Sequence, residues 1–458
     1  MVKMYGCFSR IMVKKDGMKR DIDIELSQWV TSETRIPLLL RGARQIGKTF
    51  TIKKLAETHF KNIVEINFEL EPFYIDCFQS LDPKHITTLI TDISRKKISP
   101  GETLLFLDEI QNCPRAIMAL RYFKELMPAL HVIGAGSLLE FAINDEHFSM
   151  PVGRVQYMYM KPLSFREYIN AAGYTGLLRQ LRETTIEEPL DNVLHNKLLH
   201  LVHEYLLIGG MPEAVKTYIN TQDFQAVQYQ QTILLNTYRS DFGKYAKQSN
   251  HKYLQKVFDK APALLGQQIK YNKIEDTMRS RELKEAIICL NNAGVLRTVY
   301  SSSAAGLPLQ ALINEKKFKW LFLDVGLASR ATQISISQLL NDDINLINQG
   351  AISEQLTGQE LLAYQDSRLE PQLHYWSRDE VGSQAEVDYL ITQDSQIIPI
   401  EVKSGTTGKL KSMHMLMRER KLPLGVRISE APLSFERQIL SIPFYLMSEM
   451  SRLIELHG

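Results

Sequence analysis

Four short apolar runs in the first third of the chain most constrain how it can fold. Each is bounded by turn or charged residues and separated from the next by a segment of helix length. The runs are IPLLL at 36–40, NIVEINF at 62–68, TLLFLDE at 103–109 and HVIGAGS at 131–137. This arrangement is typical of buried parallel strands connected by helices. We therefore predict an α/β fold, with a doubly wound parallel sheet in a domain spanning residues 21–172.

The remaining sequence predicts further domains, because 458 residues exceed the usual size of about 150 residues per domain. Apolar residues at helical spacing follow the first domain, and strand-like runs return near the C-terminus. A helix, a strand, a small-residue turn and a second strand in between suit a winged helix. The predicted parts are an N-terminal extension at 1–20, a helical region at 173–240, a winged-helix-like domain at 241–335 and a small α/β domain at 336–458.

The composition is that of a globular protein and excludes several functional classes. The 54 basic and 52 acidic residues leave a net charge of +2, so any site for a polyanion must be local. No run approaches the ~18 apolar residues of a membrane span. The four cysteines form no CxxC pair, which argues against a disulfide framework or a zinc cluster. We expect a cytoplasmic protein with no membrane association.

A phosphate-binding motif follows the first apolar run. Residues 42–49, GARQIGKT, have the spacing G-x-x-x-x-G-K-[ST] between a predicted strand and a helical segment. Such a turn aims backbone N–H groups and the positive end of a helix dipole at one point, where the phosphates of ATP would bind. Lys48 should reach the β- and γ-phosphates, and the Thr49 hydroxyl should bind Mg²⁺. The predicted nucleotide contacts are Gly42, Ala43, Arg44, Gln45, Ile46, Gly47, Lys48, Thr49 and Phe50.

Four further residues are candidates for the chemistry of hydrolysis. Asp108 and Glu109 end the third apolar run, where Asp108 would hold Mg²⁺ through water and Glu109 would orient or deprotonate the attacking water. Ser137, at the tip of the fourth run, is a candidate sensor of the γ-phosphate. Arg154 is a candidate for stabilising transition-state charge, from the same chain or from a neighbouring subunit. A plain turn serine and an arginine paired to a surface carboxylate are the simpler interpretations.

Several motifs together resemble one protein family. GARQIGKT, LLFLDEIQ, the GAGS strand end and VGR followed by MKPLSFREY are similar to those of prokaryotic AAA-type ATPases with a C-terminal domain of unknown function. LLIGGMPEAV, YRSDFGKY, FLDVGLA and EVDYL…PIEVKSG extend the resemblance over nearly the whole chain. The resemblance implies ATP binding and hydrolysis by an AAA-like core, a winged-helix segment and a C-terminal region similar to restriction-endonuclease-like folds.

A β-hairpin is predicted at 385–403. A two-residue turn at 394–395 would place Asp388 opposite Glu401, and Lys403 would share a face with Glu401 because side chains alternate along a strand. Like charges directly opposite each other are unfavourable unless a cation neutralises them, and a hard divalent cation prefers oxygen ligands. The hairpin therefore indicates a metal site.

This D…E-x-K pattern resembles the PD-(D/E)XK nuclease signature, in which two carboxylates hold Mg²⁺ and the lysine assists the chemistry. Glu354, on a preceding helix, is the candidate for the helical acid of that signature, and Glu360 is the second choice. The alternative interpretation is a surface hairpin on which Lys403 simply pairs with Glu401 or Asp388. A shift of register by one residue would also separate the faces.

Two main functional hypotheses remain open from the sequence, together with a third possibility, an active metal-dependent nuclease gated by ATP. In the first, an Mg²⁺-dependent ATPase is coupled to a winged-helix and nuclease-like half that acts on DNA. Cations that could contact DNA phosphates are Arg279, Arg281, Lys316, Lys317 and Lys319. In the alternative, the chain is a nucleotide-dependent switch or scaffold that holds a protein partner or a second copy of itself, and its nuclease-like domain is inactive.

Overall fold

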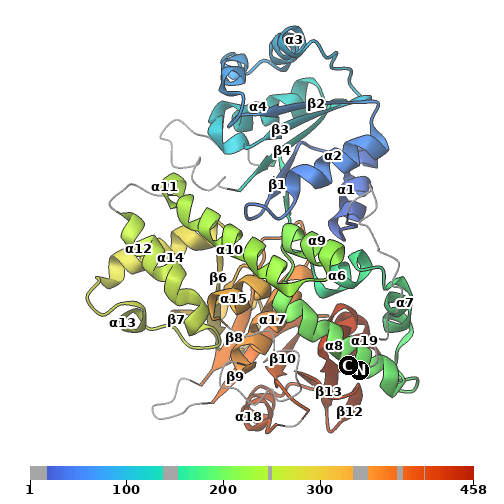
Figure 1. The fold of residues 1–458 in the computed structure, drawn as a ribbon, viewed down its shortest axis with the longest axis vertical. Helices are drawn as coiled ribbons and strands as arrows, with labels where there is room; N and C mark the ends of the chain where they lie inside the picture. The colour runs from blue at the N-terminus through green and yellow to red at the C-terminus, as the bar shows by residue number, and fades with distance from the viewer. Residues whose placement is uncertain are drawn as a thin grey trace, which may run out of the picture.

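The computed structural model describes residues 18–137, 153–245, 250–333, 349–378, 385–406 and 408–457. Most of the predicted N-terminal extension thus lies outside the described residues. The chain forms an upper lobe, coloured mainly blue, and a larger lower lobe, coloured green to red (Figure 1). Among the described residues, no helix is both long and apolar enough to cross a membrane.

The upper lobe contains a five-stranded parallel sheet in the order β2-β3-β4-β1-β5. Its first four strands coincide with the four predicted apolar runs, whereas β5 was not predicted. The strands are β1 (Leu38–Arg41), β2 (Asn62–Asn67), β3 (Thr103–Asp108), β4 (His131–Gly136) and β5 (Gln156–Tyr159). The prediction of a doubly wound α/β domain is therefore confirmed.

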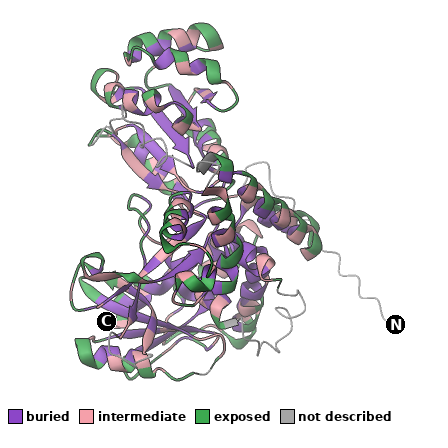
Figure 2. Ribbon diagram, turned by 90° about the vertical axis from the view of Figure 1, so that its left-hand side faces the viewer, coloured by how far each residue is buried: buried purple, intermediate pink, exposed green. Residues whose placement is uncertain are grey.

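Helices cover both faces of this sheet, so its central strands β3 and β4 are buried on both sides (Figure 2). Along β1, Leu38 and Leu40 pack into one apolar cluster with α1 and α2, while Leu39 packs into another with α3 and α4. This alternation is the period of two expected for a strand between two layers. The helices are α1 (Ile22–Thr31), α2 (Lys48–His59), α3 (Pro83–Ser94) and α4 (Pro114–Leu126).

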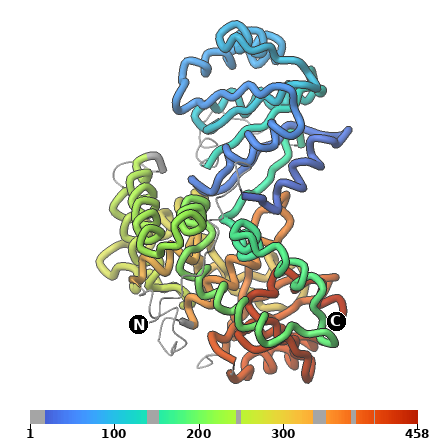
Figure 3. Tube along the Cα trace, turned by 45° about the vertical axis from the view of Figure 1, so that its right-hand side comes forward, coloured from blue at the N-terminus to red at the C-terminus, as the bar shows by residue number. Residues whose placement is uncertain are grey.

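A run of helices, the helical middle, follows β5 and extends on both sides of the helical region predicted at 173–240. Its helices are α6 (Phe165–Ala171), α7 (Thr175–Glu183), α8 (Asn192–Ile208), α9 (Pro212–Thr221), α10 (Phe224–Ser240), α11 (Phe242–Tyr245), α12 (His251–Lys260), α13 (Tyr271–Ile274) and α14 (Ser280–Asn292). The green helices of this region lie against the lower end of the blue lobe (Figure 3). The middle region is thus placed next to the carboxyl end of β1, where the phosphate-binding motif lies.

A mixed eight-stranded sheet organises the rest of the lower lobe, in the order β12-β13-β11-β10-β9-β8-β6-β7. Its strands are β6 (Leu296–Ser302), β7 (Ile313–Phe322), β8 (His374–Ser377), β9 (Glu386–Gln393), β10 (Gln396–Val402), β11 (Gly425–Ser429), β12 (Ser434–Glu436) and β13 (Ile439–Pro443). Its accompanying helices are α15 (Val325–Ala331), α17 (Gln349–Ala363), α18 (Lys411–Arg420) and α19 (Met450–His457). Short 3₁₀ helices lie at Pro72–Phe78, Ile110–Asn112, Ala261–Leu264, Leu309–Leu312 and Phe444–Glu449.

The two strands predicted for a winged helix, β6 and β7, form an antiparallel pair that belongs to this same sheet. β6 also pairs with β8, so that Tyr300 lies opposite His374. One hydrogen-bonded sheet therefore crosses the boundary that the sequence places between residues 335 and 336.

The hairpin β9–β10 has the register that the sequence predicts. Tyr389 pairs with Ile400, which makes Asp388 and Glu401 the next positions on the two strands. The turn residues Asp394 and Ser395 have φ values of 48° and 63°, as a type I′ turn requires.

Candidate functional site

The motif GARQIGKT forms the turn between β1 and α2, and both of its glycines have a backbone conformation that favours glycine. Gly42 has φ 148° and Gly47 has φ 98°. A Cβ atom on Gly42 would lie 2.4 Å from the Met160 carbonyl oxygen and 2.5 Å from Ile46 Cδ1, so no other residue fits there. The helix α2 begins directly after Gly47, and its N-terminus is a ready anion-binding position.

Lys48, the first residue of α2, is folded back onto the loop. Its Nζ donates hydrogen bonds to the carbonyl oxygens of Gly42, at 2.9 Å, and Ala43, at 2.8 Å. Burial lowers the pKa of Lys48 to about 8, although the nearby carboxylates of Glu109 and Asp108 act in the opposite direction. No carboxylate within salt-bridge distance neutralises this buried cation in the described part of the chain, so an anionic ligand would complete its charge balance.

Thr49 and Asp108 meet at the mouth of the loop. The Thr49 hydroxyl donates to Asp108 Oδ2 over 2.9 Å, and Asn67 Nδ2 lies 3.3 Å from the same oxygen. The backbone N–H of Glu109 donates to the other carboxylate oxygen, at 3.1 Å. Burial raises the pKa of Asp108. A hydroxyl and a carboxylate in contact offer the hard oxygen donors that Mg²⁺ prefers.

Glu109 follows β3 with an unusual backbone. Its φ is 50°, a left-handed value that is uncommon for any residue but glycine, and such strain concentrates at functional sites. Gln111 Nε2 donates to Glu109 Oε2 over 2.5 Å, and Arg44 Nη2 lies 3.9 Å from the other oxygen. The structure thus brings Lys48, Thr49, Asp108 and Glu109 to one end of the sheet.

Ser137 follows β4, the strand next to β1, and so lies beside the loop. Gly136 pairs with Arg41, the last residue of β1. Ser137 is buried, and its hydroxyl has no hydrogen-bond partner within the described residues. Buried hydroxyls are nearly always hydrogen-bonded, so a buried hydroxyl without a partner needs an explanation. A ligand bound in the loop would supply the partner of Ser137.

Arg154 lies at the opposite end of the sheet from the loop. It precedes β5, whose first residue Gln156 pairs with Leu38 at the beginning of β1. Its Nε forms an ion pair with Glu125 Oε1 over 3.2 Å, and half of its side chain is exposed. Within one chain, this arrangement keeps Arg154 away from a nucleotide in the loop. Arg154 could contact only a nucleotide that is bound in the loop of another subunit.

Sequence reasoning missed the main partners of Arg44, which tie the loop to the middle helices. Arg44 Nη1 pairs with Asp241 Oδ2 over 2.7 Å, and Nη2 pairs with Glu69 Oε2 over 2.9 Å. The Tyr238 hydroxyl donates to the Arg44 carbonyl oxygen over 2.6 Å. Asp241 lies 197 positions away in the sequence, so no local signal indicated this contact. The motif YRSDFGKY contains Tyr238 and Asp241, but in the sequence it indicates only a family resemblance.

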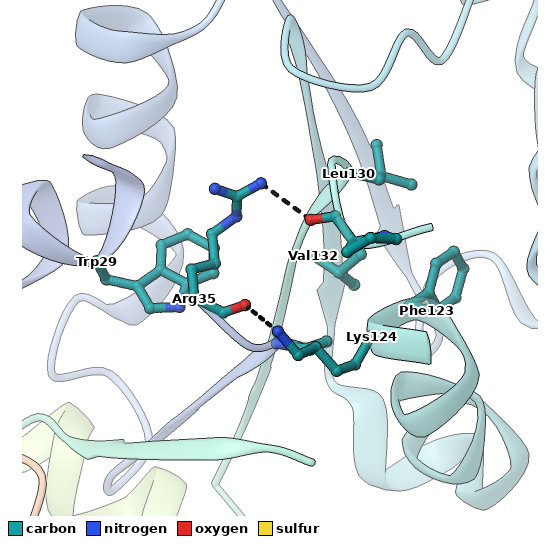
Figure 4. A pocket seen from close by; sticks show the side chains of 8 residues that line it. Trp29, Arg35, Phe123, Lys124, Leu130 and Val132 are labelled. Atoms are coloured by element: carbon teal, nitrogen blue, oxygen red, sulfur yellow. Dashed lines mark hydrogen bonds between the residues drawn. The ribbon is translucent and has the colours of Figure 1, made fainter. Parts of the chain in front are cut away.

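A small pocket also lies in the upper lobe, near the beginning of β1 and thus away from the loop (Figure 4). Lys124 Nζ donates to the Arg35 carbonyl oxygen over 3.0 Å, and Arg35 Nη2 donates to the Pro128 carbonyl oxygen over 3.1 Å. Both cations in the lining are therefore occupied by backbone oxygens. The lining residues are Trp29, Arg35, Pro37, Phe123, Lys124, Pro128, Leu130 and Val132.

In the lower lobe, the structure brings the predicted nuclease-like residues close together. Lys403 Nζ donates to Glu401 Oε1 over 2.7 Å, and Asp388 Oδ2 accepts the Val402 backbone N–H over 2.8 Å. Glu354, on α17, reaches the same region. Burial raises the pKa of Glu354 and of Glu401 to about 7. Glu401 Oε2 has no hydrogen-bond partner among the described residues.

Lys319, which the sequence made a candidate for DNA contact, lies inside this region instead. Only 2% of its surface is exposed, so the interpretation as a DNA contact is wrong for Lys319. Its Nζ lies 2.8 Å from Glu354 Oε1, 2.5 Å from Glu386 Oε1 and 3.9 Å from Asp388 Oδ1.

Glu360, the second choice for the helical acid, has another role. Its carboxylate accepts the Phe165 backbone N–H over 3.0 Å at the start of α6, and the Tyr364 hydroxyl over 2.5 Å. Glu360 therefore helps to cap a helix and is not part of the region around Lys319.

Comparisons with known proteins agree with the site in the upper lobe. Residues 34–169 match the family of the AAA domain. The upper lobe has an AAA-type P-loop fold. Residues 199–338 match Domain of unknown function (DUF8612), and residues 349–445 match Domain of unknown function (DUF4143). No curated protein matches the chain.

Several solved structures are similar to the chain at low sequence identity. The Walker-type ATPase of Pyrococcus abyssi is 15% identical, with a TM-score of 0.45, over 71% of this chain and 99% of that chain. The RuvB Holliday junction branch migration motor of Thermotoga maritima is 15% identical, with a TM-score of 0.30, over 61% and 89% of the two chains. C. elegans PCH-2 is 12% identical, with a TM-score of 0.28, over 48% and 71%.

Proposed function

We propose that the upper lobe binds and hydrolyses ATP with Mg²⁺ as its cofactor. One observation carries the proposal: the Thr49 hydroxyl lies 2.9 Å from Asp108, at the N-terminus of α2 and beside the buried Lys48. A cation, a helix N-terminus and hard oxygen donors then face one point. This combination suits a nucleoside triphosphate that carries a divalent metal.

Lys48 would bind the β- and γ-phosphates in place of the Gly42 and Ala43 carbonyl oxygens that it contacts in this structure. Thr49 and Asp108 are the residues that would hold Mg²⁺. When bound, Mg²⁺ supplies positive charge that neutralises the phosphate oxygens. The Ser137 hydroxyl, which is buried and has no described partner, would donate to the γ-phosphate.

Glu109 would orient the attacking water and accept its proton. Its carboxylate is held by Gln111 and faces Arg44, so its position is fixed before the substrate arrives. Pre-positioning of a base near the reacting water is what general-base catalysis requires. The bond between the γ-phosphorus and the bridging oxygen then breaks, and ADP and phosphate leave.

Arg44 would carry the nucleotide state to the lower lobe. It is part of the loop that binds phosphate, and it is joined directly to Asp241 after α10. A phosphate close to Arg44 would compete with Asp241 and Glu69 for the same guanidinium. The helical middle would therefore respond to whether the loop is occupied.

Phosphate release from ATP tests the proposal, with and without Mg²⁺. Native protein should release phosphate only when Mg²⁺ is present, and Lys48→Ala should abolish that release. The matched control is Lys61→Ala, an exposed lysine just before β2, at the end of the sheet away from Asp108. Release that persists in Lys48→Ala, or that continues after all divalent metal is chelated, would refute the proposal.

A further inference from the structure

Four acidic side chains gather on the lower-lobe sheet and form what we name the C-terminal carboxylate cluster. The cluster consists of Glu354, Glu386, Asp388 and Glu401. Glu354 comes from α17, Glu386 and Asp388 from β9, and Glu401 from β10. The residue pattern implies a divalent metal. The distances within the cluster decide whether these four carboxylates could hold one.

A lysine side chain already provides the positive charge of this cluster. Lys319, on β7, is 2% exposed and points its Nζ at three carboxylates, 2.8 Å from Glu354, 2.5 Å from Glu386 and 3.9 Å from Asp388. The ammonium also lies 5.2 Å from the centre of the Tyr375 ring, within cation–π distance. Neutralisation of this kind is what a buried charge needs in order to be stable.

Glu401 Oε2 has no hydrogen-bond partner among the described residues, but other oxygens that a divalent metal would need are already occupied. Lys403 occupies Glu401 Oε1 at 2.7 Å, and the Val402 backbone N–H occupies Asp388 Oδ2 at 2.8 Å. Within the described residues, no three Asp, Glu, His or Cys side chains are placed to share a metal ion. A metal beside the buried ammonium would also meet strong like-charge repulsion. The residues present therefore do not fit a metal-dependent nuclease centre.

We propose that Lys319 is the permanent counter-ion of the C-terminal carboxylate cluster and excludes a divalent metal from it. The cluster then serves as a joint between two segments of the chain. Lys319 belongs to the segment that matches one family, 199–338, whereas all four carboxylates belong to the segment that matches another, 349–445. The inference does not depend on ATP hydrolysis by the upper lobe.

The first test measures Mn²⁺ binding to the full chain by electron paramagnetic resonance, without nucleotide. Native protein and Asp388→Asn should bind Mn²⁺ equally weakly, because the cluster takes up no metal in either. A stoichiometric Mn²⁺ site in the native protein that Asp388→Asn removes would overturn the proposal. This comparison uses only the native chain and an isosteric change, so it does not require Lys319 to be replaced.

The second test removes the counter-ion. Lys319→Met should melt at a lower temperature than native protein, and Mn²⁺ should restore much of the loss while leaving the melting temperature of native protein unchanged. Adding Asp388→Asn to Lys319→Met should abolish the Mn²⁺ response. Lys316→Met, which removes an exposed lysine of the same strand, is the matched control and should behave like native protein. A Lys319→Met protein that folds but gains no Mn²⁺ response would show that Lys319 is not what excludes the metal.

Discussion

Lys48 in the upper lobe and Lys319 in the lower lobe are both buried lysines near an aspartate and a glutamate, yet their surroundings differ. Lys48 donates to two backbone carbonyls, and burial lowers its pKa to about 8. For Lys319, burial is outweighed by the carboxylates of Glu354, Asp388 and Glu386, which raise its pKa. The first lysine lacks a direct negative partner, whereas the second has its charge balanced within the chain. Similar residue types thus make an open anion site in one lobe and a closed joint in the other.

The largest expected effect distinguishes Glu109, near Lys48, from Glu401, a member of the C-terminal carboxylate cluster. Glu109→Gln should lower the rate of ATP hydrolysis about 10²- to 10⁴-fold, because it removes the general base, and should leave ATP binding nearly unchanged. Glu401→Gln, the corresponding change in the lower lobe, should leave hydrolysis at the native rate. Steady-state phosphate release and equilibrium binding of labelled ATP measure the two quantities. Equal turnover in Glu109→Gln and native protein would refute the base assignment.

Stability should respond to the lower lysine. Lys319→Met leaves buried carboxylates without their counter-ion, and breaking a buried pair in this way costs about 3–5 kcal/mol. Urea unfolding of the lower lobe, followed by the fluorescence of Trp320 and Trp376, measures this loss; both tryptophans are buried in that lobe. A change below about 1 kcal/mol, the range of exposed ion pairs, would contradict the description of the cluster as a buried joint.

Nucleotide affinity should respond to the upper lysine alone. Lys48→Ala removes hydrogen bonds between a charged group and the phosphates, and a loss of about 1.5–3 kcal/mol weakens ATP binding about 10- to 150-fold. Lys319→Met should bind ATP as native protein does. Titration calorimetry with a non-hydrolysable analogue measures both variants. If Lys319→Met also lost affinity, the two sites would be energetically connected, and Lys319 would not be confined to a role in the lower lobe.

The smallest effect is a pH dependence. The phosphates need protonated Lys48, and its pKa is about 8 in the free protein, so ATP affinity should fall above pH 8 by up to about tenfold per pH unit. Lys48→Ala should lack this slope. In the nucleotide-free protein the sign for stability is opposite. Between pH 8 and 10.5 the unfolded chain, with an ordinary lysine pKa of 10.5, binds more protons than the folded chain. The contribution of Lys48 to the free energy of unfolding should therefore increase as pH rises through that window.

Residues close together in sequence made the upper site predictable. The loop from Gly42 to Thr49 is contiguous, and Asp108 and Glu109 end a strand whose apolar pattern is unambiguous. The hairpin register was also predictable, because a turn at Asp394 and Ser395 fixes every pair on the two strands. The hairpin register follows from local geometry, whereas the contact of Thr49 with Asp108 follows because the carboxyl ends of parallel strands lie at one edge of a sheet.

Contacts between distant segments could not be predicted in this way. Lys319 contacts Glu386 although two other strands lie between β7 and β9 in the sheet. This contact depends on how α17 packs against the sheet. The Arg44–Asp241 pair depends on how the two lobes pack. The sequence left open whether Arg154 acts in its own chain or in a neighbouring subunit, and the pairing of the unpredicted strand β5 puts it at the other end of the sheet from its own loop.

The most direct test of the account is a crystal structure of the full chain with a non-hydrolysable ATP analogue and Mn²⁺, with anomalous scattering used to locate the metal. We predict one Mn²⁺ peak, between the analogue's phosphates and the side chains of Thr49 and Asp108, with Lys48 moved from the Gly42 and Ala43 carbonyls to the phosphates. We predict no peak among Glu354, Asp388 and Glu401. A Mn²⁺ ion in that cluster, or an analogue bound away from Lys48, would contradict the account.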